Sequence, residues 1–142
     1  MSLYIDTSCL LKLVFVEPES ARVHHLMQAE PQVTVSTLAE LEAEQILWAQ
    51  LLGGGLSRRD HLRLGGFLTN LRGATPFVHK TVPHDLAQIA RRQIRDSNIY
   101  CRTPDRLHLA AMEALGIRRL LTNDDQQAAA ARSLGFGVVL PR

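Results

Sequence analysis

Short apolar runs alternate along the chain with longer segments in which hydrophobic residues recur every three or four positions. The short runs predict buried strands, because they are rich in aliphatic and β-branched residues and end at polar ones. The predicted strands are residues 3–5, 32–36, 76–80, 118–122 and 137–141. Strands that alternate with helices favour an α/β fold, in which helices cover both faces of a parallel sheet.

The longer segments predict amphipathic helices with recognisable start and stop signals. They are residues 8–17, 18–29, 37–52, 57–71, 83–96, 103–116 and 124–135. The helix over 103–116 has Thr103 as its cap, Pro104 at its first position and Gly116 as its stop. Three glycines at 53–55 lack the Gly-Lys-Ser/Thr of a phosphate-binding loop, so we interpret them as a turn.

The helix over 37–52 carries three acids, of which one is expected to face inward. Its predicted apolar stripe is Leu38, Leu41, Gln45, Trp48 and Leu52. Glu42 lies beside this stripe, whereas Glu40 and Glu44 lie further round the helix and are expected to be solvated.

Composition limits the classes of protein that need considering. The 142 residues suit one domain over 1–142, and 46% hydrophobic residues are ordinary for a soluble globular protein. A net charge of +2 is weak support for nucleic-acid binding. Cys9 and Cys101 have no metal-binding spacing, which fits a reducing cytoplasm. We expect neither a signal peptide nor a membrane span, because no apolar run is long enough.

Carboxylates follow two of the predicted strands. Asp6 comes directly after residues 3–5, and Asp124 comes two residues after 118–122. Ligands of open parallel sheets gather at the carboxyl ends of the strands, so both acids are expected at one edge. Asp105 begins a helix, where a carboxylate either favours the helix dipole or adds to the same site. Several carboxylates at one edge repel each other, and a hard cation such as Mg²⁺ or Mn²⁺ removes this repulsion.

Four sequence blocks, in order, resemble PIN-domain ribonucleases, especially the VapC-type toxins of toxin–antitoxin pairs. The blocks are YIDTSCLLKLVFVEPES (4–20), VSTLAELEAEQILW (35–48), RTPDRLHLAAMEALGI (102–117) and LLTNDDQQAAAARSLGFGVVLP (120–141). The second block resembles a Ser followed six residues later by an inward Glu, which selects Glu42. The last resembles a Thr-x-Asp, which selects Asp124 over Asp125.

This resemblance implies a three-layer PIN-like fold with a mainly parallel sheet of four to five strands. It also implies Mg²⁺- or Mn²⁺-dependent hydrolysis of RNA, leaving a 5′-phosphate and a 3′-hydroxyl. The implied partners are an RNA substrate, a VapB-type antitoxin and a second copy of the chain. Asp6, Asp105 and Asp124 are expected to hold the metal, and Glu42 to bind metal or orient the attacking water.

Several nearby residues have two interpretations. Ser8 and Thr122 either support an acid or cap local structure, and His108 is either a satisfied core residue or a partner of a carboxylate. An arginine-rich stretch over 90–106 suits either phosphate contacts or a solvated helix face. From it, Arg102 and Arg106 are the candidate RNA-binding residues; Arg106 would touch RNA if it faced outward and crowd the site if it faced inward.

Two other functions remain open at this point. The same fold with its acids retained can serve only as a binding module, which would not bind Mn²⁺. It can also act as a DNA nuclease or a phosphatase, because the spacing of the acids does not specify the substrate.

Overall fold

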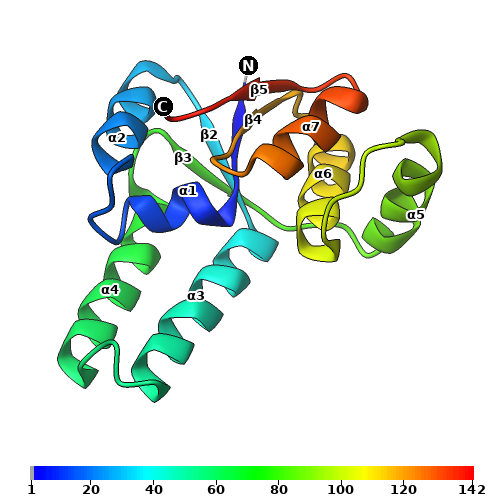
Figure 1. Ribbon diagram of the computed structural model, residues 1–142. Coiled ribbons are helices and arrows are strands. Elements are labelled where there is room, and N and C mark those ends of the chain that lie inside the picture. Colours follow the sequence, from blue (N-terminus) through cyan, green and yellow to red (C-terminus); the bar gives the residue numbers. More distant parts are fainter. Residues whose placement is uncertain (1) are drawn as a thin grey trace.

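A computed structural model describes residues 2–142 of the protein (Figure 1). Its strands are β1 (Leu3–Ile5), β2 (Val33–Ser36), β3 (Phe77–Lys80), β4 (Arg119–Leu121) and β5 (Gly137–Val139). They form one parallel sheet in the order β3-β2-β1-β4-β5, with Leu3 opposite both Val33 and Arg119. The predicted parallel α/β fold is confirmed, and β1 lies at the centre of the sheet.

Helices cover both faces of this sheet. They are α1 (Thr7–Lys12), α2 (Ser20–Ala29), α3 (Thr37–Leu52), α4 (Arg58–Asn70), the short 3₁₀ helix η1 (Leu71–Gly73), α5 (Leu86–Asp96), α6 (Thr103–Leu115) and α7 (Asp125–Ser133). Figure 1 shows α1 and α2 on the opposite side of the sheet from α5 and α6. The result is a three-layer molecule.

The alternation of side chains along β1 divides the core into two clusters. Leu3 and Ile5 pack with α1, α2 and part of α3, whereas Tyr4 packs with the apolar face of α6. Cys9 is fully buried in the first cluster, as the sequence predicts for a small apolar residue. The central strand is therefore held from both sides, and Asp6 is fixed at its end.

Some predicted helix ends are wrong. The helix predicted over 8–17 ends at Lys12, and the next begins at Ser20 instead of residue 18. The buried ammonium of Lys12 bonds Glu17 at 2.6 Å and Glu19 at 3.0 Å, which holds the intervening segment as a loop with Val16 fully exposed. The helix predicted from residue 83 begins at Leu86. By contrast, α3 has the predicted bounds, and α6 ends at a left-handed Gly116.

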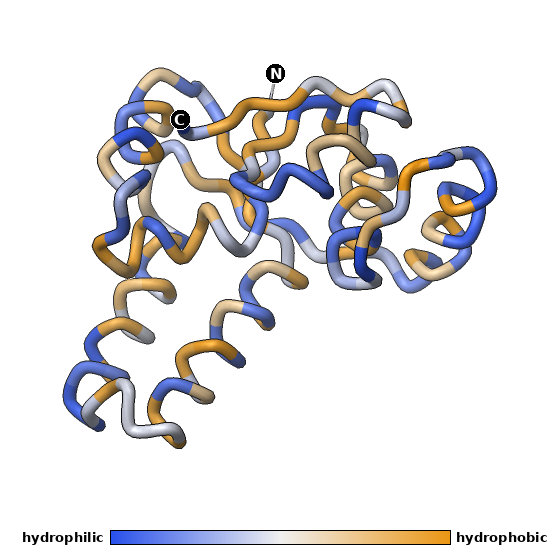
Figure 2. Tube along the Cα trace, in the orientation of Figure 1, coloured by the Kyte–Doolittle hydropathy of each residue, from blue (hydrophilic) through white to orange (hydrophobic). Residues whose placement is uncertain are grey.

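The apolar stripe predicted for α3 does not face the core. Ala39, Ala43 and Leu47 are buried, whereas the side chains of Leu41 and Trp48 are at least half exposed. Small residues allow α3 to pack closely, and the larger ones are left on the outside. α3 and α4 pack on each other and extend together away from the sheet (Figure 1), with apolar residues along both (Figure 2).

Candidate functional site

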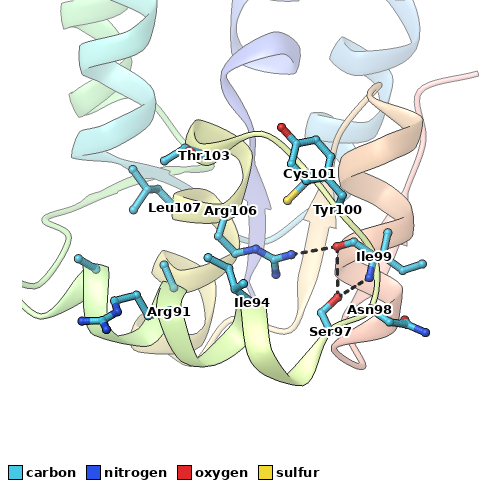
Figure 3. Close-up of a pocket in the computed structure, with 12 residues that line it drawn as sticks. Arg91, Ile94, Ser97, Asn98, Ile99, Tyr100, Cys101, Thr103, Arg106 and Leu107 are labelled. Carbon is cyan, nitrogen blue, oxygen red and sulfur yellow. Dashed lines mark hydrogen bonds between the residues drawn. The ribbon is translucent and has the colours of Figure 1, made fainter.

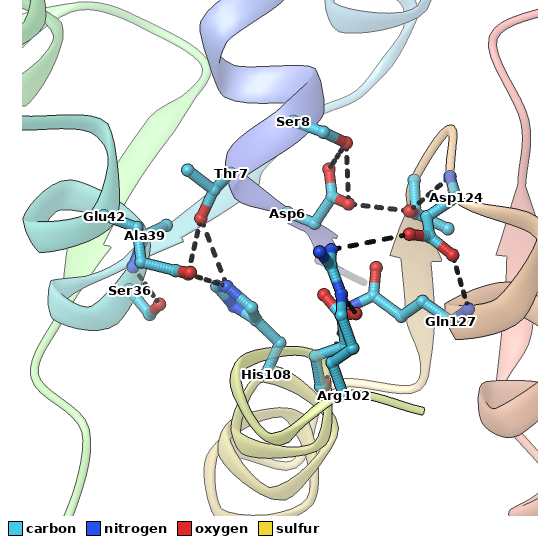
Figure 4. Close-up of polar contacts among 12 residues, drawn as sticks. Asp6, Thr7, Ser8, Ser36, Ala39, Glu42, Arg102, His108, Asp124 and Gln127 are labelled. Carbon is cyan, nitrogen blue, oxygen red and sulfur yellow. Dashed lines mark hydrogen bonds and ion pairs between the residues drawn. The ribbon is translucent and has the colours of Figure 1, made fainter. Parts of the chain in front are cut away.

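The four acids line one pocket of about 290 Å³ at the carboxyl ends of β1 and β4. Asp6 follows β1, and Asp124 begins α7 just after β4. Glu42 comes from the second turn of α3 and Asp105 from the first turn of α6. The pairing of β1 with β4 therefore brings together residues that are more than one hundred positions apart (Figure 4).

Asp6 is the most enclosed of the four acids. Its carboxylate accepts hydrogen bonds from the backbone N–H of Cys9 at 2.8 Å, from Ser8 at 2.9 Å and from Thr122 at 2.6 Å. The bond from Cys9 also caps α1. Burial nevertheless raises the pKa of Asp6, against the opposing effect of these donors. The free energy cost of this buried charge favours a cation beside it.

Thr122 links Asp6 to Asp124. Its hydroxyl donates to Asp6 and accepts the backbone N–H of Asp124 at 3.0 Å. The Asp124 carboxylate in turn caps α7 by accepting the N–H of Gln127 at 2.9 Å. Ser8 and Thr122 thus both support an acid, and helix capping, which was the competing interpretation of Ser8, is performed by Asp6 instead.

Arg102 pairs with Asp105 and Asp124, and Figure 4 shows its guanidinium directed toward Asp124. Its Nε is 3.3 Å from Asp105 and its Nη2 is 3.9 Å from Asp124. Burial raises the pKa of Asp105, and Asp124 raises it further, against the lowering effect of Arg102. The guanidinium supplies positive charge between two carboxylates that would otherwise repel each other.

Glu42 belongs to a hydrogen-bonded chain that reaches the sheet. Its Oε1 accepts a bond of 2.8 Å from Thr7 and is hydrogen-bonded to Nε2 of His108. The other ring nitrogen of His108 lies 2.6 Å from the hydroxyl of Tyr4, which is 2.7 Å from the hydroxyl of Ser36. Partial burial opposes ionisation, but the bonds to His108 and Thr7 hold the pKa of Glu42 below its usual value. His108 is therefore both a buried residue and the partner of a carboxylate.

The pocket has the chemistry of a hard-cation site. Its lining includes five acids, namely Asp6, Glu17, Glu42, Asp105 and Asp124, but only two basic residues, Lys12 and Arg102, besides His108. Carboxylate and hydroxyl oxygens are the ligands that Mg²⁺ prefers. Residues 2–142 contain no preformed set of three His, Cys, Asp or Glu ligands, and Arg102 pairs with Asp105 and Asp124. A cation bound by Asp105 and Asp124 would compete with this guanidinium for the two carboxylates.

Arg106, the second candidate RNA-binding residue, lies outside the acidic pocket. Arg106 is buried and faces a different cavity, so it neither crowds the acidic pocket nor reaches it from outside. Arg92 pairs with Asp96 and Glu113 at a distance from the acids. Of the two candidate RNA-binding residues, Arg102 lines the acidic pocket and Arg106 does not.

Four residues of this site were missed by sequence reasoning. Lys12 and Glu17 line the pocket, while Thr7 and Tyr4 position the pair of Glu42 and His108. Tyr4 had one signal in the sequence, since a tyrosine in a short buried strand needs a partner for its hydroxyl. Glu40 is also not solvated as expected, because Arg72 bonds both of its carboxylate oxygens.

None of the helices in residues 2–142 has the length and apolar character needed to cross a bilayer.

Comparisons with known proteins agree with this geometry. The family model of the PIN domain matches residues 3–133. Ribonuclease VapC46 of Mycobacterium tuberculosis (strain ATCC 25618 / H37Rv) is 30% identical over 142 residues, covering 99% of this chain and 98% of that protein.

Solved structures share the fold at lower identity. VapC20 of Mycobacterium tuberculosis, a toxin that cleaves the sarcin-ricin loop, superposes with a TM-score of 0.70 at 21% identity, covering 94% of this chain and 95% of that one. A toxin–antitoxin complex from Klebsiella pneumoniae superposes with a TM-score of 0.65 at 18% identity, covering 100% of this chain and 98% of that one. Because the family model matches residues 3–133 and VapC46 is 30% identical over nearly the full length of both chains, the chain belongs to the PIN-domain family.

Proposed function

We propose that this protein is a Mg²⁺- or Mn²⁺-dependent endoribonuclease that hydrolyses RNA phosphodiester bonds and acts as the toxin of a toxin–antitoxin pair. The observation that carries this proposal is the convergence of Asp6, Glu42, Asp105 and Asp124 on one pocket. The identity to Ribonuclease VapC46 over nearly the full length of both chains supports RNA as the substrate.

In this proposal, Asp6, Asp105 and Asp124 hold the metal. Asp6 is the central ligand, since its position is fixed by three hydrogen-bond donors. When bound there, Mg²⁺ or Mn²⁺ would neutralise charge on a phosphodiester and make water a stronger nucleophile. The carboxylate of Asp124 also caps α7, as that of Asp6 caps α1.

Glu42 is proposed to orient the attacking water and take its proton. Its lowered pKa keeps it ionised at neutral pH, as a proton acceptor must be. His108 holds the carboxylate in place, and Tyr4 fixes the imidazole from the other side. Arg102 is exposed at the mouth of the pocket, where release from its two acids would allow it to contact an RNA phosphate.

The exposed apolar surface of α3 and α4 supports a protein partner. Leu41, Trp48 and Leu62 line a cavity of about 590 Å³ between the two helices, and Leu52 is also exposed nearby. Such a surface is typical of protein interfaces. We assign it to a VapB-type antitoxin, in line with the toxin–antitoxin complex of similar fold.

We also expect a homodimer, and the proposed RNA substrate implies action in the cytoplasm.

The decisive experiment incubates the purified protein with RNA, with single-stranded DNA and with a small phosphate ester, and measures the cleavage of each. We expect cleavage of RNA alone, dependent on Mg²⁺ or Mn²⁺ and abolished by a chelator. Asp6→Asn should remove this activity, because the amide keeps the shape but not the charge of the ligand. Undiminished cleavage by Asp6→Asn would eliminate the proposed metal site, and cleavage of DNA or the ester would reassign the substrate.

A further inference from the structure

Another cavity lies between α5, α6 and the loop that joins them (Figure 3). Its volume is about 530 Å³, within the range of roughly 300–1,000 Å³ that small-molecule sites occupy. It shares no lining residue with the acidic pocket. The proposed ribonuclease mechanism therefore makes no use of it.

The walls of this cavity are mainly apolar. Ala87, Ala90 and Ile94 contribute from α5, Leu107 from α6, and Ile99 from the loop. Ile94 is more than half exposed, although it belongs to the face of α5 that turns toward the cavity. An apolar lining of this kind favours a ligand with a hydrocarbon or aromatic body.

The charged residues that line the cavity are all cationic. Arg91 and Arg106 contribute guanidinium groups, and no Asp or Glu is among the lining residues. Thr103, the first residue of α6, also lines it, and the start of a helix carries partial positive charge. The electrostatic complement of this lining is an anion.

Arg106 provides the most specific feature. Its side chain is only 4% exposed, which is rare for an arginine without a carboxylate partner. Nη2 donates to the carbonyl of Ile99 at 3.1 Å, but the buried Nη1 has no hydrogen-bond partner among residues 2–142. Figure 3 shows this guanidinium between Ile94 and the loop, at the wall of the cavity. A buried cationic donor without an acceptor is costly, and an anionic ligand would satisfy it.

We propose that this cavity binds a small organic carboxylate with an apolar body, the chemistry of a medium-chain fatty acid. The carboxylate bonds the guanidinium of Arg106, with Arg91 adding long-range attraction from the rim. The apolar body lies against Ile94, Ile99 and Leu107. A neutral acceptor such as an alcohol could bond Nη1 but would lack the charge that strengthens this bond, and a cationic ligand would be repelled by both arginines.

The test uses three ligands of equal chain length: decanoate, decanol and decylamine. Each is titrated into the ¹⁵N-labelled full-length protein, and amide chemical shifts are followed by NMR. Decanoate should shift resonances within residues 86–107 in a saturable way, and bind about tenfold or more tightly than decanol. Decylamine should bind more weakly still.

Variants separate this site from general hydrophobic binding. Ile94→Glu places a negative charge at the cavity without altering Arg106, and should weaken decanoate binding about tenfold. Arg91→Gln should weaken it by a smaller factor. Leu52→Glu is the matched control, an exposed aliphatic residue on α3 changed in the same way, and should leave decanoate binding unchanged.

Two results would overturn the proposal. One is equal affinity for decanoate and decanol. The other is that decanoate produces no saturable shifts in residues 86–107, including the case in which a second copy of the chain covers the cavity. Because the experiment requires neither metal nor RNA, its failure would leave the proposed ribonuclease activity unaffected.

Discussion

Thr122 donates a hydrogen bond of 2.6 Å to Asp6, across 116 positions of sequence. The bond joins the ends of β1 and β4, and the same hydroxyl accepts the backbone N–H of Asp124. One fully buried side chain therefore sets the separation of two proposed metal ligands.

Replacing this hydroxyl should weaken metal binding without removing any ligand. Thr122→Val keeps the shape of the side chain, but deprives Asp6 of a donor and Asp124 of an acceptor. We expect Mn²⁺ affinity to fall by about tenfold or more, as for other residues that orient metal ligands. Isothermal titration calorimetry measures this, with the exposed Thr69→Val as a control. Equal affinities in the two variants would show that Thr122 does not orient the site.

Removal of Arg102 should have opposite effects on metal and on RNA. Arg102→Gln leaves Asp105 and Asp124 without a counter-charge, so Mn²⁺ should bind several-fold more tightly. RNA should bind more weakly, with a shallower dependence of affinity on salt concentration, because one phosphate contact is lost. Calorimetry and filter binding report the two affinities separately. A parallel loss of both would mean that Arg102 supports the site structurally.

Asp124 and the adjacent Asp125 form a matched pair for testing the fourth acid. Asp124→Asn preserves the cap of α7, since asparagine caps as well as aspartate, and should leave the melting temperature almost unchanged. It should nevertheless reduce metal-dependent RNA cleavage by an order of magnitude or more. Asp125→Asn, which breaks only an exposed pair with Arg142, should retain full activity. If Asp125→Asn lost activity and Asp124→Asn retained it, the fourth acid of the site would be Asp125.

The dependence of stability on pH should reveal the raised pKa of Asp6. Between the ordinary aspartate value of 3.8 and this raised pKa, the folded protein binds more protons than the unfolded one. The free energy of unfolding of the metal-free protein should therefore fall as pH rises through this window. Asp6→Asn should remove that part of the slope and be more stable than the wild type at pH 7 without metal.

Urea denaturation at several pH values, with and without Mn²⁺, checks this prediction. The lowered pKa of Glu42 makes the free energy of unfolding rise with pH, which is opposite in sign to the effect of Asp6. The contribution of Asp6 is therefore obtained by subtracting the pH profile of Asp6→Asn from that of the wild type. Mn²⁺ should stabilise the wild type and not the variant. Parallel pH profiles for the two proteins would contradict a raised pKa.

The hydrogen bonds that link Glu42 through His108 to Tyr4 predict that loss of the Tyr4 hydroxyl lowers the free energy of unfolding. Tyr4→Phe leaves a ring nitrogen of His108 without its bond to the phenol and removes the hydroxyl partner of Ser36. We expect a loss of about 1–3 kcal/mol in the free energy of unfolding, the usual cost of unsatisfied buried polar groups. Tyr100→Phe, at an exposed position, is the control for denaturation. A loss no larger than that of the control would mean that these bonds contribute little.

Much of the fold follows from the sequence, because strand and helix signals in this chain are local. The bounds of α3 and the glycine stop of α6 are examples. The stripe on α3 was wrong for a physical reason: periodicity finds an apolar side but does not distinguish the core from a partner surface, and here alanines face the sheet. Glu42 does line the pocket and remains one turn from Leu38 along the helix, but the positions of α3 that are buried are Ala39, Ala43 and Leu47.

The contacts that organise the site were harder to predict, because they join distant segments. The ion pairs of Arg102 and the phenol of Tyr4 depend on how α6 packs over the sheet. The direction of Arg106 depends on the same packing. A sequence pattern gives the helical face of each residue, but not the element that the face meets.

The central place of β1, between β2 and β4, has a consequence during synthesis. The ribosome delivers Asp6 and Glu42 before Asp105 and before β4, the strand that positions Asp124. A nascent polypeptide that ends before residue 105 cannot assemble the acidic pocket, because half of its four acids have not yet been translated. Nascent chains that end before residue 124 therefore lack at least one of the four acids, so the order of synthesis delays the acidic pocket until β4 has been made.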